Sequence, residues 1–468
     1  FSKNTSRTDV QLKMAQEYHR AKLRGKSFKG QDLTGVDFSN SDIRGSDFTN
    51  AILTGANFSH TKSGLQRRWA IIIILFTLVL SAISGLMSAV GGSLVGFILI
   101  DSARSHLYTG VASLIILSVF FLLSIRKGVL SACVFLAVAI ALAVVTAVAW
   151  AGFVAVVWSG LAAASEATEI APIVAVVATG TVAVIVTAVG AVCVTISAAI
   201  SGAIAGIFAV MITVMIAGTV AGAVSVFAMM TNPVAGIVAG TVSVMLVILS
   251  AYIGCSAISE DKKQNFVRKI AISLTTRYGT SFRNADLTDA DFTQAKLKSA
   301  NFNKAKVKRT NWFEIKQVHL AAVNTTYLEN TQMRELVVNK DLQNKIFDGW
   351  NLRGINLQGG NLKDASFVGA NLNESNLRNA DISRAKLVRS QLDKADLRSA
   401  NLTGAYVEDW NITPQTLLYP INCDYIFLRV PTPEDPNPHR LPTNWEANFQ
   451  DGEFKKSMNP LLKVSNFG

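Results

Sequence analysis

Large apolar side chains recur at every fifth residue in three separate stretches of this chain, and the residue two places before each is usually Ala or Ser. A period of five matches neither an α-helix nor a flat strand. It fits a square coil in which each pentapeptide forms one side, with the large and the small residue pointing inward. Asp, Asn, Thr, Gly and Ser fill the remaining positions, as corners require. The large residues that we expect to be buried include Phe28, Leu33, Phe38, Phe48, Phe282, Leu287, Phe292, Leu297, Leu352, Leu357, Leu372, Leu377 and Leu397.

This pattern resembles the A-(D/N)-L-x-x repeat of the pentapeptide-repeat proteins. The segment NLRGINLQGGNLKDASFVGANL, residues 351–372, is most similar to cyanobacterial members. The resemblance implies a right-handed quadrilateral β-helix, a solenoid of stacked coils. It implies no catalytic residue, because the family shares none, and the fold alone does not assign a function.

One function known in this family is the imitation of DNA by an acidic coil that inhibits gyrase. Residues 281–412 contain 19 Lys and Arg against 15 Asp and Glu, a net charge of +4, which argues against such imitation. The basic residues alternate with acidic ones and no aromatic platform accompanies them, so we also expect no nucleic-acid partner.

A second, unrelated pattern lies between the first two stretches. Residues 69–258 are overwhelmingly apolar, and no charged side chain occurs from Ile170 to Ser259. A helix that crosses a bilayer needs about 20 apolar residues, so this region predicts a polytopic α-helical membrane domain. Four or five spans with one re-entrant piece is the alternative to six. The six expected spans are 69–100, 107–125, 129–160, 170–199, 202–230 and 234–258.

Pairs of glycines spaced four apart recur within these spans. Such a pair lies on one helix face and lets two helix backbones approach closely. We therefore interpret the paired glycines as packing positions, within one chain or between chains. The pairs are Gly92 and Gly96, Gly202 and Gly206, Gly218 and Gly222, and Gly236 and Gly240.

The positions of the basic residues predict an orientation. Arg67 and Arg68 precede the first span, Arg126 and Lys127 follow the second, and four Lys and Arg residues at 262–269 follow the sixth. Basic flanks stay in the cytoplasm. Six spans then place both termini and all repeats on the cytoplasmic side of an integral membrane protein, in a plasma or thylakoid membrane. The net charge of +12 favours anionic membrane lipids as partners.

Residues that could carry chemistry are sparse. The four cysteines (Cys133, Cys193, Cys255 and Cys423) form no CxxC pair, and the five histidines are scattered. No phosphate-binding loop is present in the sequence. We therefore predict no catalytic residue, no cofactor and no metal site.

The boundaries of these patterns divide the chain into seven parts. Two coils of the first block are too few to be stable alone, because a solenoid needs about three repeating units. We expect the first block to stack on the second, with Phe48, Leu53 or Phe58 close to Phe282, Leu287 or Phe292, so that the three blocks form one continuous solenoid of about seven coils. The alternative is that the N-terminal coils pair with a second chain. The parts are an N-terminal cap at 1–20, a first repeat block at 21–60, the membrane domain at 69–258, a second block at 278–312, an insertion at 313–344, a third block at 345–413 and a capping tail at 414–468.

These features predict a non-enzymatic, membrane-anchored scaffold or adaptor. Its cytoplasmic solenoid would present a surface to a protein partner or to another copy of the chain. The alternative is a passive channel or small-solute facilitator that the solenoid gates or assembles. A polar cavity along the helices would favour the channel, and a filled bundle would favour the scaffold.

Overall fold

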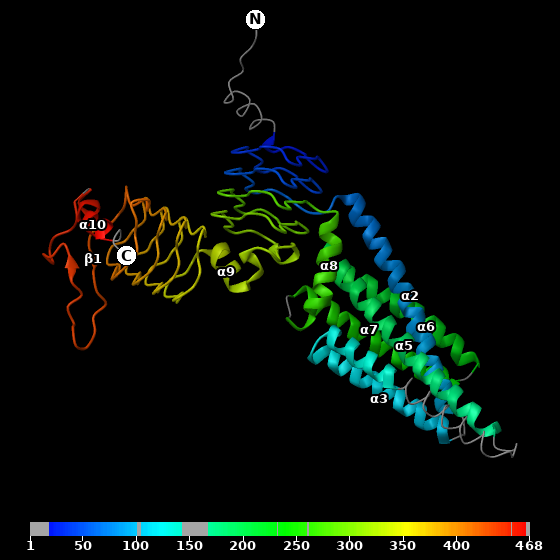
Figure 1. Ribbon diagram of the computed structural model, residues 1–468. Helices are drawn as coiled ribbons and strands as arrows, with labels where there is room; N and C mark the ends of the chain where they lie inside the picture. The colour runs from blue at the N-terminus through cyan, green and yellow to red at the C-terminus, as the bar shows by residue number, and fades with distance from the viewer. Residues whose placement is uncertain are drawn as a thin grey trace, which may run out of the picture. The chain divides into compact units, whose positions relative to one another are not determined.

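The computed structural model describes residues 18–100, 104–142, 167–231, 233–259, 262–450 and 452–464. The chain forms two compact units (Figure 1). One is β-helical and comprises Phe1–Gly64 and Gly279–Gly468; the other is helical and comprises Leu65–Tyr278. Most of the predicted N-terminal cap, residues 1–17, lies outside the described residues.

Parallel bridges between residues twenty positions apart build the coils of the β-helical unit. Lys22 pairs with Asp42, and Asn371 pairs with Gln391. The corner residue of each pentapeptide takes a left-handed conformation, as at Asn40 with φ 60°. Where Asp or Asn precedes the large residue, its side chain stabilises the corner: the carboxylate of Asp37 accepts a hydrogen bond from the backbone N–H of Ser39 at 2.9 Å. The repeat composition thus follows from the geometry of one corner.

The large residue of each pentapeptide points into the coil. Every inward position named from the sequence is at most 3% exposed and belongs to one continuous core. These residues are Phe28, Leu33, Phe38, Phe48, Phe282, Leu287, Phe292, Leu297, Leu352, Leu357, Leu372, Leu377 and Leu397.

The coils before and after the helical unit form one stack, as predicted. The rings of Phe48 and Phe282 stack with centroids 5.1 Å apart, and those of Phe58 and Phe292 with centroids 4.9 Å apart. Residues 18–64 and 279–323 together are named the N-terminal stack below.

The helical unit is inserted without any change of register. Asp47 pairs with Ser281, 234 positions later instead of 20, and the excess equals the 214 residues of Leu65–Tyr278. The insertion falls inside the turn of one pentapeptide. There the backbone N–H of Gly64 donates to the hydroxyl of Thr280 at 3.0 Å.

The third repeat block does not extend this ladder, so the prediction of one continuous solenoid was wrong beyond the second block. Among residues 262–450, the ladder stops at Ala322 and resumes at Asp341. The gap holds the 3-10 turn η3 (Tyr327–Glu329) and helix α9 (Thr331–Asn339); the turn η2 (Val318–Leu320) lies in the last coil before it. The insertion is therefore shorter than the predicted 313–344.

Helix α9 covers the end of the N-terminal stack. Asn330 caps it by accepting hydrogen bonds from the backbone N–H groups of Gln332 and Met333. Leu336 and Val337 are buried in the common core. An apolar helix face thus takes the place of the next coil.

Residues 341–427 form a second ladder, named the C-terminal stack below. It runs past the predicted end at 413, because Tyr406 still pairs with Phe427. Strand β1 (Ile426–Phe427) then pairs antiparallel with β2 (Arg440–Leu441). Phe454 and Met458 of helix α10 (Glu453–Val464) are buried in the solenoid core, so the tail closes this end.

The helical unit is a bundle in which α2 packs on α5, α6 and α7 (Figure 1). Gly206, with φ 83°, separates α5 from α6, so the break predicted near Ser201 lies further along. The helices are α2 (Arg67–Ile100), α3 (Arg104–Arg126), α5 (Ala167–Ala205), α6 (Ile207–Thr231), α7 (Pro233–Ile258) and, after the 3-10 turn η1 (Lys262–Gln264), α8 (Asn265–Arg277).

Among the described residues of this unit, 4 helices are long and apolar enough to cross a membrane. The described parts of the second and third predicted spans are shorter apolar helices, Val111–Arg126 and Val129–Leu142, and residues 143–160 lie outside the description. The four long segments are Arg67–Leu94, Thr181–Ala205, Ala209–Met230 and Ala239–Ala257.

The glycine pairs are packing positions only in part. A methyl group added at Gly236 would lie 2.4 Å from the Cα of Met229, which marks a close helix contact. Gly222 faces open space, and Gly206 ends a helix instead of packing against one. Gly218 and Gly240 have only ordinary contacts, at 3.7 and 3.8 Å, while Gly202 is buried.

Comparably close contacts occur at glycines outside these pairs. A methyl group at Gly85 would lie 2.4 Å from the carbonyl oxygen of Ala217, and one at Gly254 would lie 2.7 Å from the Cβ of Ala198. Of the earlier pair at Gly92 and Gly96, Gly92 is 3.0 Å from the Cα of Ala239 by the same measure. Helix α2 thus approaches its neighbours at Gly85 and Gly92, of which only Gly92 belongs to a pair.

Candidate functional site

Several hydroxyl side chains of the helical unit are turned inward. Thr77, Ser81, Ser84, Ser201 and Thr213 are buried. The Ser81 hydroxyl donates to the Thr213 carbonyl at 2.5 Å, and the Ser84 hydroxyl donates to the Gly190 carbonyl. The Ser201 and Thr213 hydroxyls lie 2.9 Å apart. These groups therefore hold helices together and do not line an open polar path.

The outward surface of the same helices is apolar. Phe227, Met230 and Met245 are 70%, 81% and 74% exposed. A groove of about 620 Å³ between α3 and α7 is lined by apolar side chains such as Phe121 and Ile248. An apolar outside around a hydroxyl-bonded inside is the distribution that a lipid surrounding favours.

An aromatic patch lies at the end of the C-terminal stack, formed by Tyr406, Tyr425, Phe427 and Trp445. The ring of Phe427 lies 5.1 Å from that of Tyr406, 5.5 Å from Tyr425 and 6.3 Å from Trp445. Trp445 is 64% exposed. Exposed aromatic residues of this kind are enriched in protein interfaces.

Arg440 fixes the loop that carries Trp445. Its side chain is buried, and its guanidinium donates to the carbonyl oxygens of Pro442 at 2.7 Å and Ala447 at 2.8 Å. The same group lies 4.6 Å from the ring centroid of Tyr425. The loop is thus held in place from both its ends, so the aromatic patch is preformed.

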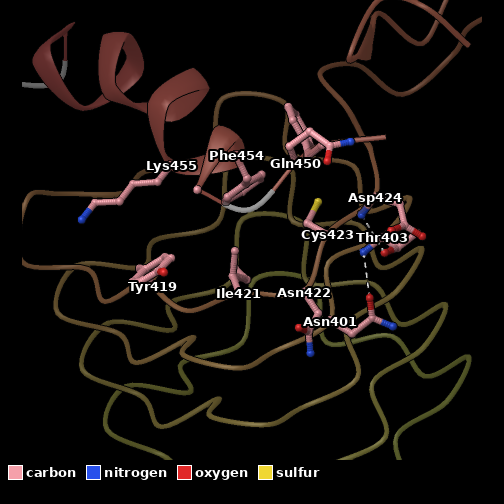
Figure 2. Close-up of a pocket in the computed structure, with 12 residues that line it drawn as sticks. Asn401, Thr403, Tyr419, Ile421, Asn422, Cys423, Asp424, Gln450, Phe454 and Lys455 are labelled. Atoms are coloured by element: carbon pink, nitrogen blue, oxygen red, sulfur yellow. Dashed lines mark hydrogen bonds between the residues drawn. The ribbon is translucent and has the colours of Figure 1, made fainter. Parts of the chain in front are cut away.

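A polar pocket of about 500 Å³ lies between the last coil and α10 (Figure 2). The backbone N–H of Asp424 donates to the Thr403 hydroxyl at 3.1 Å on one wall. On the other wall the Lys455 ammonium lies 5.8 Å from the ring centroid of Tyr419. Figure 2 shows the Cys423 thiol directed toward the α10 side of the pocket.

The chemistry of this pocket does not favour catalysis. Burial, with the charge of Asp424 as a second cause, raises the pKa of the Cys423 thiol to about 12. The thiol therefore stays protonated at neutral pH and is a poor nucleophile. Among the described residues of the lining, Asp424 is the one carboxylate and Lys455 the one amine. No nucleophile and general base are paired there.

Lys340 joins the two stacks. Its ammonium donates to the side-chain oxygen of Asn311 in the N-terminal stack at 2.7 Å, and to the carbonyl oxygen of Gln358 in the C-terminal stack at 3.1 Å. Burial lowers the pKa of Lys340 to about 8, although the charge of Asp291 acts in the opposite direction. A buried amine thus lies at the joint.

This pKa predicts how stability depends on pH. Between about pH 8 and pH 10.5 the unfolded chain keeps the Lys340 proton while the folded chain has lost it, so the free energy of unfolding rises with pH. The contribution of Lys340 to this rise is about 3 kcal/mol at most, and it is complete above pH 10.5. Urea unfolding of the full chain in detergent, followed by tryptophan fluorescence, measures the rise.

Lys340→Met is the control, because other groups also titrate in this range. The variant should lose a large part of the rise between pH 8 and pH 10.5. An identical pH profile in both proteins would show that Lys340 keeps an ordinary pKa in the folded chain.

Comparison with known proteins supports the repeat assignment. A family model for pentapeptide repeats matches the chain in 8 copies, at residues 19–50, 32–62, 278–311, 351–387 and 375–409. No curated protein matched the chain.

Several solved structures are similar to the β-helical coils. A pentapeptide-repeat protein from the thylakoid lumen of Arabidopsis thaliana is 32% identical over 16% of this chain and 61% of its own, with a TM-score of 0.13. HetL from the cyanobacterium Nostoc, involved in heterocyst differentiation regulation, is 22% identical over 32% of this chain and 60% of its own, with a TM-score of 0.13.

A further similar structure is QnrB1, a plasmid-mediated fluoroquinolone resistance protein. It is 18% identical over 31% of this chain and 66% of its own, with a TM-score of 0.17. The chain thus spans less than two thirds of the length of each of these three proteins. Together with the family match, the coil geometry shows that pentapeptide repeats build the β-helical unit of this chain.

Proposed function

We propose that this chain is a non-enzymatic, membrane-anchored scaffold whose β-helical unit presents a preformed surface to a protein partner. The helical unit is the anchor, and the aromatic patch around Trp445 is the centre of the binding surface. The β-helical unit lies on the cytoplasmic side.

The way the helical unit is inserted supports the anchor. Gly64 and Gly279 occupy consecutive places in one coil, so the inserted helices leave and return on the same side of the membrane. An even number of crossings follows. Basic residues flank the insertion at Arg67, Arg68 and Arg277, which favours the cytoplasm for that side.

The aromatic patch is the observation that carries the scaffold function. Tyr, Trp and Arg contribute most of the binding energy in many protein interfaces. Here the guanidinium of Arg440 already holds the Trp445 loop, so binding requires little ordering of the chain. The buried and bonded hydroxyls of the helical unit favour an anchor over a passive channel.

Trp445→Ala is expected to weaken binding of the partner by roughly 30-fold or more, which corresponds to a loss of about 2 kcal/mol at an interface centre. A photoreactive amino acid at position 445 first identifies the partner in intact cells. Binding of the purified partner to full-length protein in nanodiscs is then measured for the natural chain and the variant.

Gln391→Ala is the matched control, because Gln391 is exposed on another face of the same stack. Its affinity should equal that of the natural chain. Equal affinities for Trp445→Ala and Gln391→Ala would place the binding surface elsewhere. Unchanged thermal unfolding of both variants shows that neither result comes from misfolding.

A further inference from the structure

Positive charge in the N-terminal stack gathers on one of its four faces. Bridges align Lys22, Asp42, Lys62, Lys296 and Lys316 in a single outward column, one residue from each successive coil. Three further basic side chains lie two residues beyond members of this column. The resulting basic face contains seven basic residues and one acidic residue: Lys22, Arg24, Arg44, Lys62, Lys296, Lys298, Lys316 and Asp42.

The other three outward columns of the same stack have the opposite character. Their bridged positions include five aspartates and one lysine: Asp32, Asp37, Asp47, Asp286, Asp291 and Lys306. At the bridged positions, lysine thus gathers on one face and aspartate on the other three, although Lys29, Arg283 and Lys308 lie two residues beyond bridged positions of those other faces.

The single carboxylate of the basic face is already neutralised. Burial tends to raise the pKa of Asp42, but hydrogen bonds from Arg44 and Arg24 outweigh burial and hold that pKa well below its usual range. Arg44 binds it at 2.7 Å. Asp42 therefore remains charged and paired with Arg24 and Arg44, which leaves the exposed column of Lys62, Lys296 and Lys316.

Three successive coils place lysines directly above one another. Lys62, Lys296 and Lys316 are exposed, and in the described part of the chain none has a carboxylate within ion-pair distance. Coils are about 4.8 Å apart, and like charges directly opposite each other on neighbouring strands are destabilising. Among the described residues no ion pair offsets this repulsion, and Asp42, the bridge neighbour of Lys62, is already bound by Arg24 and Arg44, which favours an external anion.

The basic face ends where the helical unit begins. Gly64, two residues after Lys62, is the last residue of the coil before the insertion, and α2 begins at Arg67. Three residues of chain span at most about 11 Å. If α2 crosses a membrane, as the proposed function requires, lipid headgroups are therefore within reach of this face.

We propose that the basic face binds the anionic headgroups of the membrane in which the helical unit is anchored. The ligand chemistry is lipid phosphate. Phosphates at the bilayer surface would neutralise the column formed by Lys62, Lys296 and Lys316 and hold the N-terminal stack at the membrane.

Composition favours lipid over nucleic acid as the occupant. Single-stranded nucleic acid binds where aromatic side chains accompany the positive charge, so that bases can stack. No aromatic side chain occurs at the bridged positions of this face or two residues beyond them, where Gly64 and the buried Val318 accompany the basic residues. A flat row of ammonium groups instead matches a surface of phosphates.

Amine modification of the full chain in nanodiscs tests the proposal. Discs of phosphatidylcholine alone are compared with discs containing 30% phosphatidylglycerol. We expect acetylation of Lys62, Lys296 and Lys316 to slow at least about fivefold in the anionic discs, since each basic residue near such a surface gains roughly that factor. Lys306 and Lys345 should react equally in both. At 1 M salt the difference should disappear, because the Debye length falls to about 3 Å.

Equal rates at the three lysines in both discs would overturn the proposal. So would protection in neutral discs by inorganic phosphate or by single-stranded RNA, which would assign the face to a soluble anion. Failure of the protein to remain in the discs at all would instead refute the membrane anchor. The two failures are therefore distinguishable.

The unfolding temperature of a triple variant tests the proposal independently, because its expected difference from the natural chain changes between neutral and anionic discs. Lys62→Gln, Lys296→Gln and Lys316→Gln together remove the repulsion, so the triple variant should unfold at a higher temperature than the natural chain in neutral discs. In anionic discs this advantage should vanish or reverse. A control with Lys29→Gln, Lys304→Gln and Lys345→Gln, all exposed and outside the basic face, should follow the natural chain in both. The same advantage in both lipids would contradict the proposal.

Discussion

Phe282→Ala is expected to lower the free energy of unfolding of the β-helical unit by about 3–5 kcal/mol. Phe282 is the first large inward residue after the insertion and is fully buried. Its ring stacks on those of Phe48 and Phe302, with centroids 5.1 and 5.0 Å away. Phe58 and Phe292 contact it edge-on at 5.4 and 5.5 Å. Removing it leaves a cavity where the two parts of the stack meet.

The neighbouring Arg283 provides the control. Its side chain is exposed, so Arg283→Ala should change the free energy of unfolding by no more than about 0.5 kcal/mol. Urea unfolding of full-length protein in detergent compares the two. If both substitutions had the same effect, the register across the insertion would be wrong.

The register of the coils could be predicted from the sequence because each pentapeptide repeats the same pattern of inward and corner residues. A large residue such as Phe48 and a corner residue such as Asn50 occupy fixed places in every repeat, and the corner conformation depends only on neighbouring residues. The joining of the first two blocks followed from stability, since two coils alone expose too much apolar surface. The interruption at 313–344 was predicted as an insertion, but the end of the ladder after Ala322 was not, because the repeat pattern does not show that α9 replaces a coil.

Helix packing could not be predicted from glycine spacing. The spacing shows which residues share a helix face, but not which face meets a neighbouring helix. Gly222 therefore faces open space, whereas the unpaired Gly85 lies against Ala217. The deciding contacts are between residues far apart in the chain, and the sequence carries no periodic pattern for them.

The candidate surfaces also depend on distant contacts. Lys62 and Lys296 become neighbours only after residues 65–278 are removed from the count, so their shared column is hidden in the linear sequence. If residues 65–278 are left out and the sequence is written in rows of twenty residues, Lys62 and Lys296 stand in one column. The aromatic patch has no such pattern, because Arg440 reaches Trp445 and Tyr425 from an irregular tail.

The central claim is that the helical unit is a membrane anchor inserted into a turn of an otherwise complete solenoid. Deletion of residues 65–278 joins Gly64 to Gly279 and restores the twenty-residue spacing. Deletion of residues 65–280 removes two more residues and shifts Phe282 out of the inward register. The second deletion is the matched control.

The measurement is membrane fractionation with alkaline extraction, followed by thermal unfolding of the soluble protein. We predict that the full chain stays in the membrane, and that the 65–278 deletion is soluble and unfolds cooperatively. The 65–280 deletion should be strongly destabilised or aggregate. Extraction of the full chain at alkaline pH, or equal misfolding of the two deletions, would contradict the claim.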